Sequence, residues 1–72
     1  MSKKDEVYRF LGEMNVPVSE NVKKKIENYR YSDKTKISLG ADAIEVRTDF
    51  DDGQRQYMGI SRDGKDAVIR AE

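Results

Sequence analysis

The 72 residues of this chain include no cysteine and no histidine. Without cysteine, a disulfide framework and a thiolate metal site are both excluded, so a packed core alone must hold the domain together. Without histidine, the chain lacks the commonest general base, the commonest zinc ligand and one member of the Ser-His-Asp triad. We therefore expect no metal, no cofactor and no catalytic residue, that is, a protein that is not an enzyme.

Long apolar runs and an excess of one charge are missing as well. No stretch approaches the roughly 20 apolar residues that a membrane span needs, and no signal-peptide core follows the charged start of the chain. The 14 basic and 14 acidic residues cancel, so attraction to nucleic acid or lipid must come from a local patch. We expect a single cytoplasmic domain over residues 1–72 that does not bind a membrane.

The first 31 residues show apolar side chains at helical spacing. One helix is expected over about residues 3–14, from an N-cap at Ser2 to a left-handed Asn15. A second is expected from an N-cap at Ser19 to about Tyr31. The apolar positions are Val7, Phe10, Leu11 and Met14 in the first helix and Val22, Ile26 and Tyr29 in the second.

After residue 36 the apolar spacing changes to every second residue, which predicts four strands. In the middle hairpin, a three-residue loop over 51–53 pairs Val46 with Met58 and places Gly53 at the left-handed position. A two-residue loop would turn the two apolar sets to opposite faces. The last hairpin is expected to use a type I′ turn at Asp63-Gly64, which pairs Ile60 with Ala67, and the first hairpin is expected to pair Ile37 with Val46. The shared apolar face then comprises Ile37, Leu39, Ile44, Val46, Met58, Ile60, Ala67 and Ile69.

These patterns predict an α+β fold, with two N-terminal helices packed on one face of a four-stranded antiparallel β-meander. The alternative is a winged helix-turn-helix, with residues 15–18 as the turn and the middle hairpin as the wing. That architecture normally has three helices, and only two are evident here. Charged residues protect both edge strands, which favours a monomer over a homodimer.

The register that buries the aliphatic set turns the alternate residues toward solvent. It predicts a row of side chains across all four strands: Lys36, Arg47, Tyr57 and Arg70. A tyrosine between guanidinium groups can stack on single-stranded bases while the cations contact phosphates. Half-solvated sheets also carry such residues with no function, each pair contributing about 0.2–1 kcal/mol. The interpretation without a function is the simpler one, and the like charges of Lys36 and Arg47 side by side are the detail that argues for a function.

Two further segments are candidate contact surfaces. On the second helix, Lys24, Asn28 and Tyr31 are expected on the face opposite the apolar stripe, where they could meet a phosphate backbone. Phe50, beside the middle turn, is expected either at the rim of the core or as an anchor inserted into a partner. The aspartates around it begin like a calcium loop, but Ile60 occupies the position of the bidentate glutamate, which indicates a simple hairpin turn.

The function expected from the sequence is that of a small binding module, a regulator or inhibitor of an unidentified protein partner. Its contact residues would be Arg47, Phe50, Tyr57 and Arg70. The alternative is nucleic-acid binding, through the sheet row or the second helix. The residues of this alternative are Lys24, Asn28, Tyr31, Lys36, Arg47, Tyr57 and Arg70.

Overall fold

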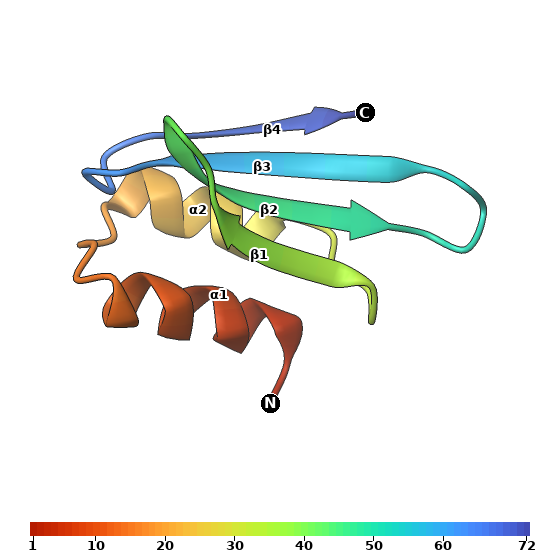
Figure 1. The fold of residues 1–72 in the computed structure, drawn as a ribbon, viewed down its shortest axis with the longest axis horizontal. Helices are drawn as coiled ribbons and strands as arrows, with labels where there is room; N and C mark the ends of the chain where they lie inside the picture. Colours follow the sequence, from red (N-terminus) through yellow and green to blue (C-terminus); the bar gives the residue numbers. More distant parts are fainter.

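Two helices precede four strands in the computed structural model, which describes all residues, 1–72 (Figure 1). The elements are α1 (Lys3–Glu13), α2 (Glu20–Asn28), β1 (Thr35–Leu39), β2 (Ala43–Asp49), β3 (Arg55–Ser61) and β4 (Ala67–Ala71). The strands form one sheet in the order β1-β2-β3-β4, with every neighbouring pair antiparallel. The predicted α+β meander is confirmed, and the winged helix-turn-helix alternative is wrong because there is no third helix. Neither helix has the length and apolarity needed to cross a bilayer.

Helix α1 begins and ends where local chemistry dictates. The Ser2 hydroxyl accepts a hydrogen bond from the Asp5 amide at 3.1 Å, as the N-cap pattern predicts. At the other end Asn15 adopts a left-handed φ of 58°, as expected. The amides of Asn15 and Val16 donate to the carbonyls of Gly12 and Leu11, which satisfies the last turn of the helix.

Helix α2 ends at Asn28, three residues before the expected end at Tyr31. Tyr29 takes an extended conformation instead, with φ −68° and ψ 144°, and its ring enters the core. Its hydroxyl donates to the Gln56 carbonyl at 2.9 Å, beneath the sheet. Tyr31 turns back, and its hydroxyl donates to the Ile26 carbonyl at 2.8 Å. Placing Tyr31 on the outer face of the helix was therefore wrong, because burial of Tyr29 ends the helix first.

The sheet register agrees with the prediction at each hairpin, including Val46 opposite Met58 and Ile60 opposite Ala67. In the middle loop Gly53 has a φ of 87°, and the Phe50 amide donates to the Gln54 carbonyl, as the three-residue loop requires.

The turn type expected for the last hairpin was wrong. A type I′ turn needs two left-handed residues, and only Gly64, with φ 73°, is left-handed there. Asp63 instead accepts hydrogen bonds from the Ser61 hydroxyl at 2.7 Å and the Lys65 amide at 3.0 Å. The result is a four-residue loop, 62–65, that keeps the same register. The Pro17 carbonyl lies where a side chain on residue 64 would be. Glycine is therefore required at this position both for its left-handed φ and for the space it leaves to Pro17.

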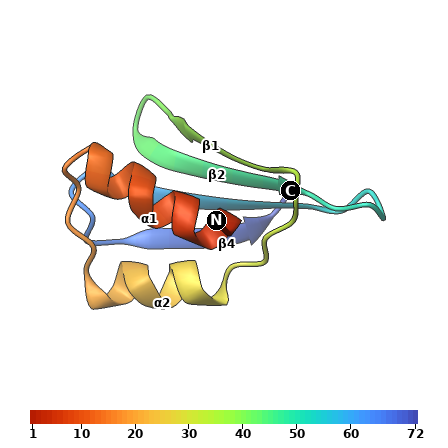
Figure 2. The same cartoon turned by 90° about the horizontal axis from the view of Figure 1, so that it is seen from below.

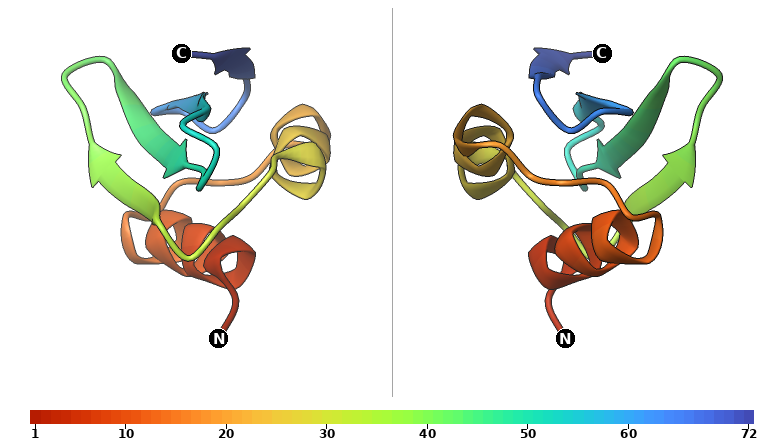
Figure 3. Two further views of the ribbon diagram at one scale, coloured as in Figure 1. Left: turned by 90° about the vertical axis from the view of Figure 1, so that its right-hand side faces the viewer. Right: turned by 90° about the vertical axis from the view of Figure 1, so that its left-hand side faces the viewer.

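Both helices cover the same face of the sheet, α1 near β1 and α2 near β4 (Figures 2 and 3). The hydrophobic side chains that are almost completely buried are Val7, Leu11, Val22, Ile26, Ile44, Val46, Met58 and Ile60. The outer strands are covered less well, so Ile37, Ala67 and Ile69 are only partly buried. Leu39, expected in the core, is 48% exposed because it ends the edge strand β1.

One carboxylate ties the two helices together. Glu27 of α2 accepts hydrogen bonds from the Tyr8 hydroxyl at 2.7 Å and the Lys4 ammonium at 3.1 Å, both on α1. These bonds lower the pKa of Glu27. Burial, together with the hydrogen bond and charge of Glu27, raises the pKa of Tyr8 to about 12.

We predict that this tie weakens in acid. The unfolded chain protonates Glu27 at a higher pH than the folded chain, so its contribution is present above the ordinary pKa of 4.5 and is lost as the pH falls. Urea titrations should therefore show that stability falls less between about pH 5 and about pH 3 in Glu27→Gln than in the wild type. Glu20→Gln, which removes an exposed carboxylate with no such tie, should keep the wild-type dependence. Identical pH dependence in all three proteins would contradict the prediction.

Candidate functional site

The uncovered face of the sheet carries the row of side chains that the sequence predicts. Lys36 lies opposite Arg47, Arg47 opposite Tyr57, and Tyr57 opposite Arg70, so the row crosses all four strands. Both helices lie on the other side of the sheet (Figure 3). This face is therefore available to a ligand.

Tyr57, however, does not present its ring to solvent, as we had expected from its position. Only 7% of the residue is exposed. The guanidinium carbon of Arg70 lies 4.3 Å from the ring centroid and that of Arg47 lies 5.0 Å away. The Tyr57 hydroxyl donates to a carboxylate oxygen of Glu45 at 3.4 Å. The two arginines and the glutamate thus take the positions that a stacked base would need.

Gly59 makes room for this arrangement. Tyr57 lies along its own strand toward Gly59, two residues further on, and a Cβ at Gly59 would come within 2.7 Å of the Tyr57 hydroxyl oxygen. A glycine inside a strand often marks such a close approach. The sequence contains that signal, but it does not say which side chain uses the space.

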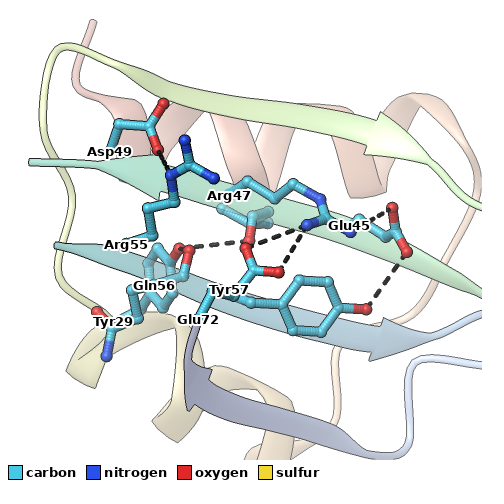
Figure 4. Close-up of polar contacts among 9 residues, drawn as sticks. Tyr29, Glu45, Arg47, Asp49, Arg55, Gln56, Tyr57 and Glu72 are labelled. Carbon is cyan, nitrogen blue, oxygen red and sulfur yellow. Dashed lines mark hydrogen bonds and ion pairs between the residues drawn. The ribbon is translucent and has the colours of Figure 1, made fainter. Parts of the chain in front are cut away.

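Arg47 is the centre of the polar network on this face (Figure 4). Its Nη1 donates to the two carboxylate oxygens of Glu72 at 2.8 and 3.1 Å, and its Nη2 lies 3.6 Å from a carboxylate oxygen of Glu45. Partial desolvation works to lower the pKa of Arg47, but the charges and hydrogen bonds of the two glutamates outweigh it and raise the pKa. The repulsion expected between Lys36 and Arg47 is thereby offset. Sequence reasoning missed both glutamates as members of the site.

A polar hollow of about 460 Å³ lies beside Arg47. Its lining is Lys34, Lys36, Ile37, Ser38, Arg47, Asp49, Arg55 and Glu72. Arg55 pairs with Asp49 at 3.2 Å, which is the cross-strand pair that the register implies. Lys36 makes no ion pair. The hollow therefore combines three paired cations with one that is free.

Helix α2 presents a second charged surface. Lys23, Lys24, Lys25 and Asn28 are exposed on it, and none of these lysines makes an ion pair. Glu27 is engaged with α1. This surface and the sheet row lie on opposite sides of the sheet (Figure 3). The residues considered for nucleic-acid binding therefore do not form one continuous surface.

Phe50 lies at the β2–β3 hairpin and is half-buried. The guanidinium carbon of Arg30 lies 4.3 Å from its ring centroid. The neighbouring aspartates have partners within the chain: Asp51 pairs with Lys34 at 3.6 Å, and Asp52 accepts a hydrogen bond from the Gln54 amide at 3.0 Å. The acids therefore serve the hairpin and its surroundings, as the turn interpretation expects.

The open face carries charged groups of both signs. The guanidinium groups of Arg47 and Arg55 pair with carboxylates at distances between 2.8 and 3.6 Å, and the Lys36 ammonium is left without an ion pair. A ligand would meet donors and acceptors already held in position, which lowers the entropy lost on binding. Comparison with protein-family models, curated proteins and solved structures finds no match for this chain.

We predict that Gly59→Ala destabilises the fold by about 1–3 kcal/mol, because the new Cβ displaces the Tyr57 ring from between the two arginines. In a Tyr57→Ala background the same change should be neutral or stabilising by up to about 1 kcal/mol, since alanine is preferred to glycine in a strand. Urea denaturation of the four proteins measures this coupling.

Gly12→Ala provides the control for the glycine substitution itself. A Cβ at Gly12 meets no atom within 4 Å, so this change should not destabilise the fold. If Gly59→Ala costs the same stability with and without Tyr57, the ring does not depend on the space at Gly59.

Proposed function

We propose that this chain is a non-enzymatic protein-binding module that regulates or inhibits a partner through its open sheet face. The observation that carries the proposal is the balance of charge on that face. Lys36, Arg47, Arg55 and Arg70 alternate there with Glu45, Asp49 and Glu72. A surface of both signs can exchange ion pairs with a protein, whose surface is also mixed.

The acidic groups of this face also argue against a nucleic acid on it. Phosphates approaching Arg47 would also approach Glu45 and Glu72, which already pair with it. Affinity for nucleic acid comes mainly from neutralising phosphates, and single-strand recognition adds stacking on exposed aromatic rings. Tyr57, the aromatic residue of the row, is 7% exposed. The open face therefore offers little for either phosphate neutralisation or base stacking.

The β2–β3 hairpin extends this surface beyond the rest of the sheet (Figure 1). Phe50 at its base remains partly exposed, with one face covered by the Arg30 guanidinium. Aromatic side chains in such positions supply large contact areas at small entropic cost. By strand alternation Phe50 lies on the helix-covered side of the sheet with Val46 and Thr48, so we infer that it contributes an apolar anchor at the hairpin and not within the polar row.

We further propose that the module acts as a cytoplasmic monomer. The edge strands support this: β1 carries Lys36, and β4 carries Arg70 and is preceded by Asp66. Charged side chains on edge strands disfavour pairing with a second sheet.

A second candidate function is nucleic-acid binding through α2. It is favoured by the three consecutive lysines, Lys23, Lys24 and Lys25, which are exposed and unpaired on a face that does not include the sheet row. With Asn28 they could contact a phosphate backbone, mainly without sequence preference. This candidate predicts a strong salt dependence that follows the number of phosphates contacted.

Two double charge reversals separate these functions. Arg47→Glu with Arg70→Glu alters the open face, and Lys24→Glu with Lys25→Glu changes α2 by the same charge. Affinity capture from the source cell, with cross-linking and mass spectrometry, should show that the first variant loses the partner by about tenfold or more and the second retains it. Both variants must first unfold at wild-type urea concentrations within about 1 M. Capture that survives the first variant but not the second would overturn the proposal in favour of α2.

Phe50→Ala tests the anchor separately. We predict about a tenfold loss of partner affinity, the size expected for truncating an aromatic interface residue. Binding of a labelled oligonucleotide at low salt, if any occurs, should not change, because α2 would carry it. Unchanged partner affinity would remove Phe50 from the interface.

A further inference from the structure

The polar hollow beside Arg47 has the composition of a carboxylate site. Its charged lining residues are four cations, Lys34, Lys36, Arg47 and Arg55, and two carboxylates, Asp49 and Glu72, and its only apolar lining residue is Ile37. Guanidinium groups bind carboxylates through two nearly parallel hydrogen bonds, and lysines add charge with less geometric demand. We propose that this hollow receives an acidic segment of the protein partner, and that Glu72 occupies it in the free protein as a competing carboxylate. This inference rests on the proposed function.

Glu72 already shows how a carboxylate fits the hollow. Both of its carboxylate oxygens accept hydrogen bonds from Arg47 Nη1, at 2.8 and 3.1 Å (Figure 4). Glu72 follows the last residue of β4, and its amide donates to the Arg55 carbonyl at 3.1 Å. Its side chain can rotate away from Arg47 without breaking the β3–β4 ladder. An incoming carboxylate can therefore take over the same guanidinium.

Lys36 is the second reason for choosing an acidic segment. It lies opposite Arg47 in the sheet and has no ion pair of its own. A second carboxylate of the same segment can pair with Lys36 without displacing any group of this chain. Lys34 and Arg55 are already paired with Asp51 and Asp49, so a carboxylate of the ligand could pair with them only by displacing these aspartates.

The observations favour a peptide over a nucleic acid in this hollow. The group that already pairs with Arg47 in the hollow is a carboxylate, that of Glu72. The ring of Tyr57 is covered by Arg47 and Arg70, so bases would find no platform on which to stack. An acidic peptide needs only the cations and space for an extended chain.

Competition by Glu72 has a measurable consequence. When part of the protein population has its site occupied internally, the apparent Kd of an external ligand equals the intrinsic Kd divided by the fraction of the population whose site is free. The ion pair of Glu72 is partly exposed, with 28% of its side chain accessible, so the blocked state is only moderately favoured. Removing the Glu72 carboxylate should then strengthen binding of an acidic peptide by about three- to tenfold.

The test uses the full chain and a fluorescein-labelled hexaglutamate peptide, with binding followed by fluorescence anisotropy at about 20 mM salt. Glu72→Gln should bind about three- to tenfold more tightly than the wild type. Glu20→Gln makes the same chemical change on α2 and should bind like the wild type. An equal gain in both variants would show that the peptide senses net charge alone, and it would overturn the proposal.

Two further variants locate the binding. In the Glu72→Gln background, Lys36→Gln and Arg47→Gln should each weaken binding by about fivefold or more. Lys36 makes no ion pair, so Lys36→Gln remains informative if Arg47→Gln fails to fold. Undiminished binding by Lys36→Gln would overturn the site. Tighter binding of a labelled oligothymidylate than of the peptide, with the same dependence on residues 36 and 72, would also overturn it and assign the hollow to nucleic acid.

The outcome separates this inference from the proposed function. If hexaglutamate binds none of the variants while the open-face double reversal still abolishes partner capture, the face binds a protein but not through an acidic segment. If partner capture is unaffected by the double reversal, the proposed function itself fails, whatever the peptide does.

Discussion

The register of the sheet is the constraint on which the rest of the molecule depends. It places Val46 and Met58 under the helices and Arg47 and Tyr57 on the opposite face. A slip of one residue would exchange these sets and bury Arg47 away from its glutamates. Burying an unpaired charge costs several kcal/mol, so the three-residue loop at 51–53, with its left-handed Gly53, specifies the fold as well as the turn.

The two outer surfaces differ in how their charges are compensated, although the chain as a whole is neutral. On the open face, Arg47 and Arg55 each have a carboxylate partner within 3.2 Å, and Lys36 and Arg70 make no ion pair. On α2, the three consecutive lysines have none. Net charge therefore says little about the ligands of this protein, and the local pairing of charges distinguishes the surfaces. A paired surface suits a protein of mixed charge, and an unpaired one suits a polyanion.

Tyr57 lies on the outer face of the sheet, but its main role is to hold neighbouring side chains in place, because little of its own surface is exposed. Its ring fills the space that Gly59 leaves and separates two arginines that would otherwise be free to move. Because Arg47 is held in this way, its guanidinium points toward Glu72 before any ligand arrives. The ring and the two glutamates thus restrict the conformations open to Arg47.

Local sequence patterns were enough to predict the N-caps at Ser2 and Ser19, the left-handed Asn15 and the register of all three hairpins. These features follow from local rules: hydroxyl caps, backbone sterics and apolar alternation act over a few residues. Tertiary structure alone decided where α2 ends, because Tyr29 donates to carbonyls on β2 and β3. It likewise decided that Tyr57 is covered and that Glu72 pairs with Arg47, 25 residues away in the chain. No local pattern encodes such contacts, since they arise only when the packed elements bring distant side chains together.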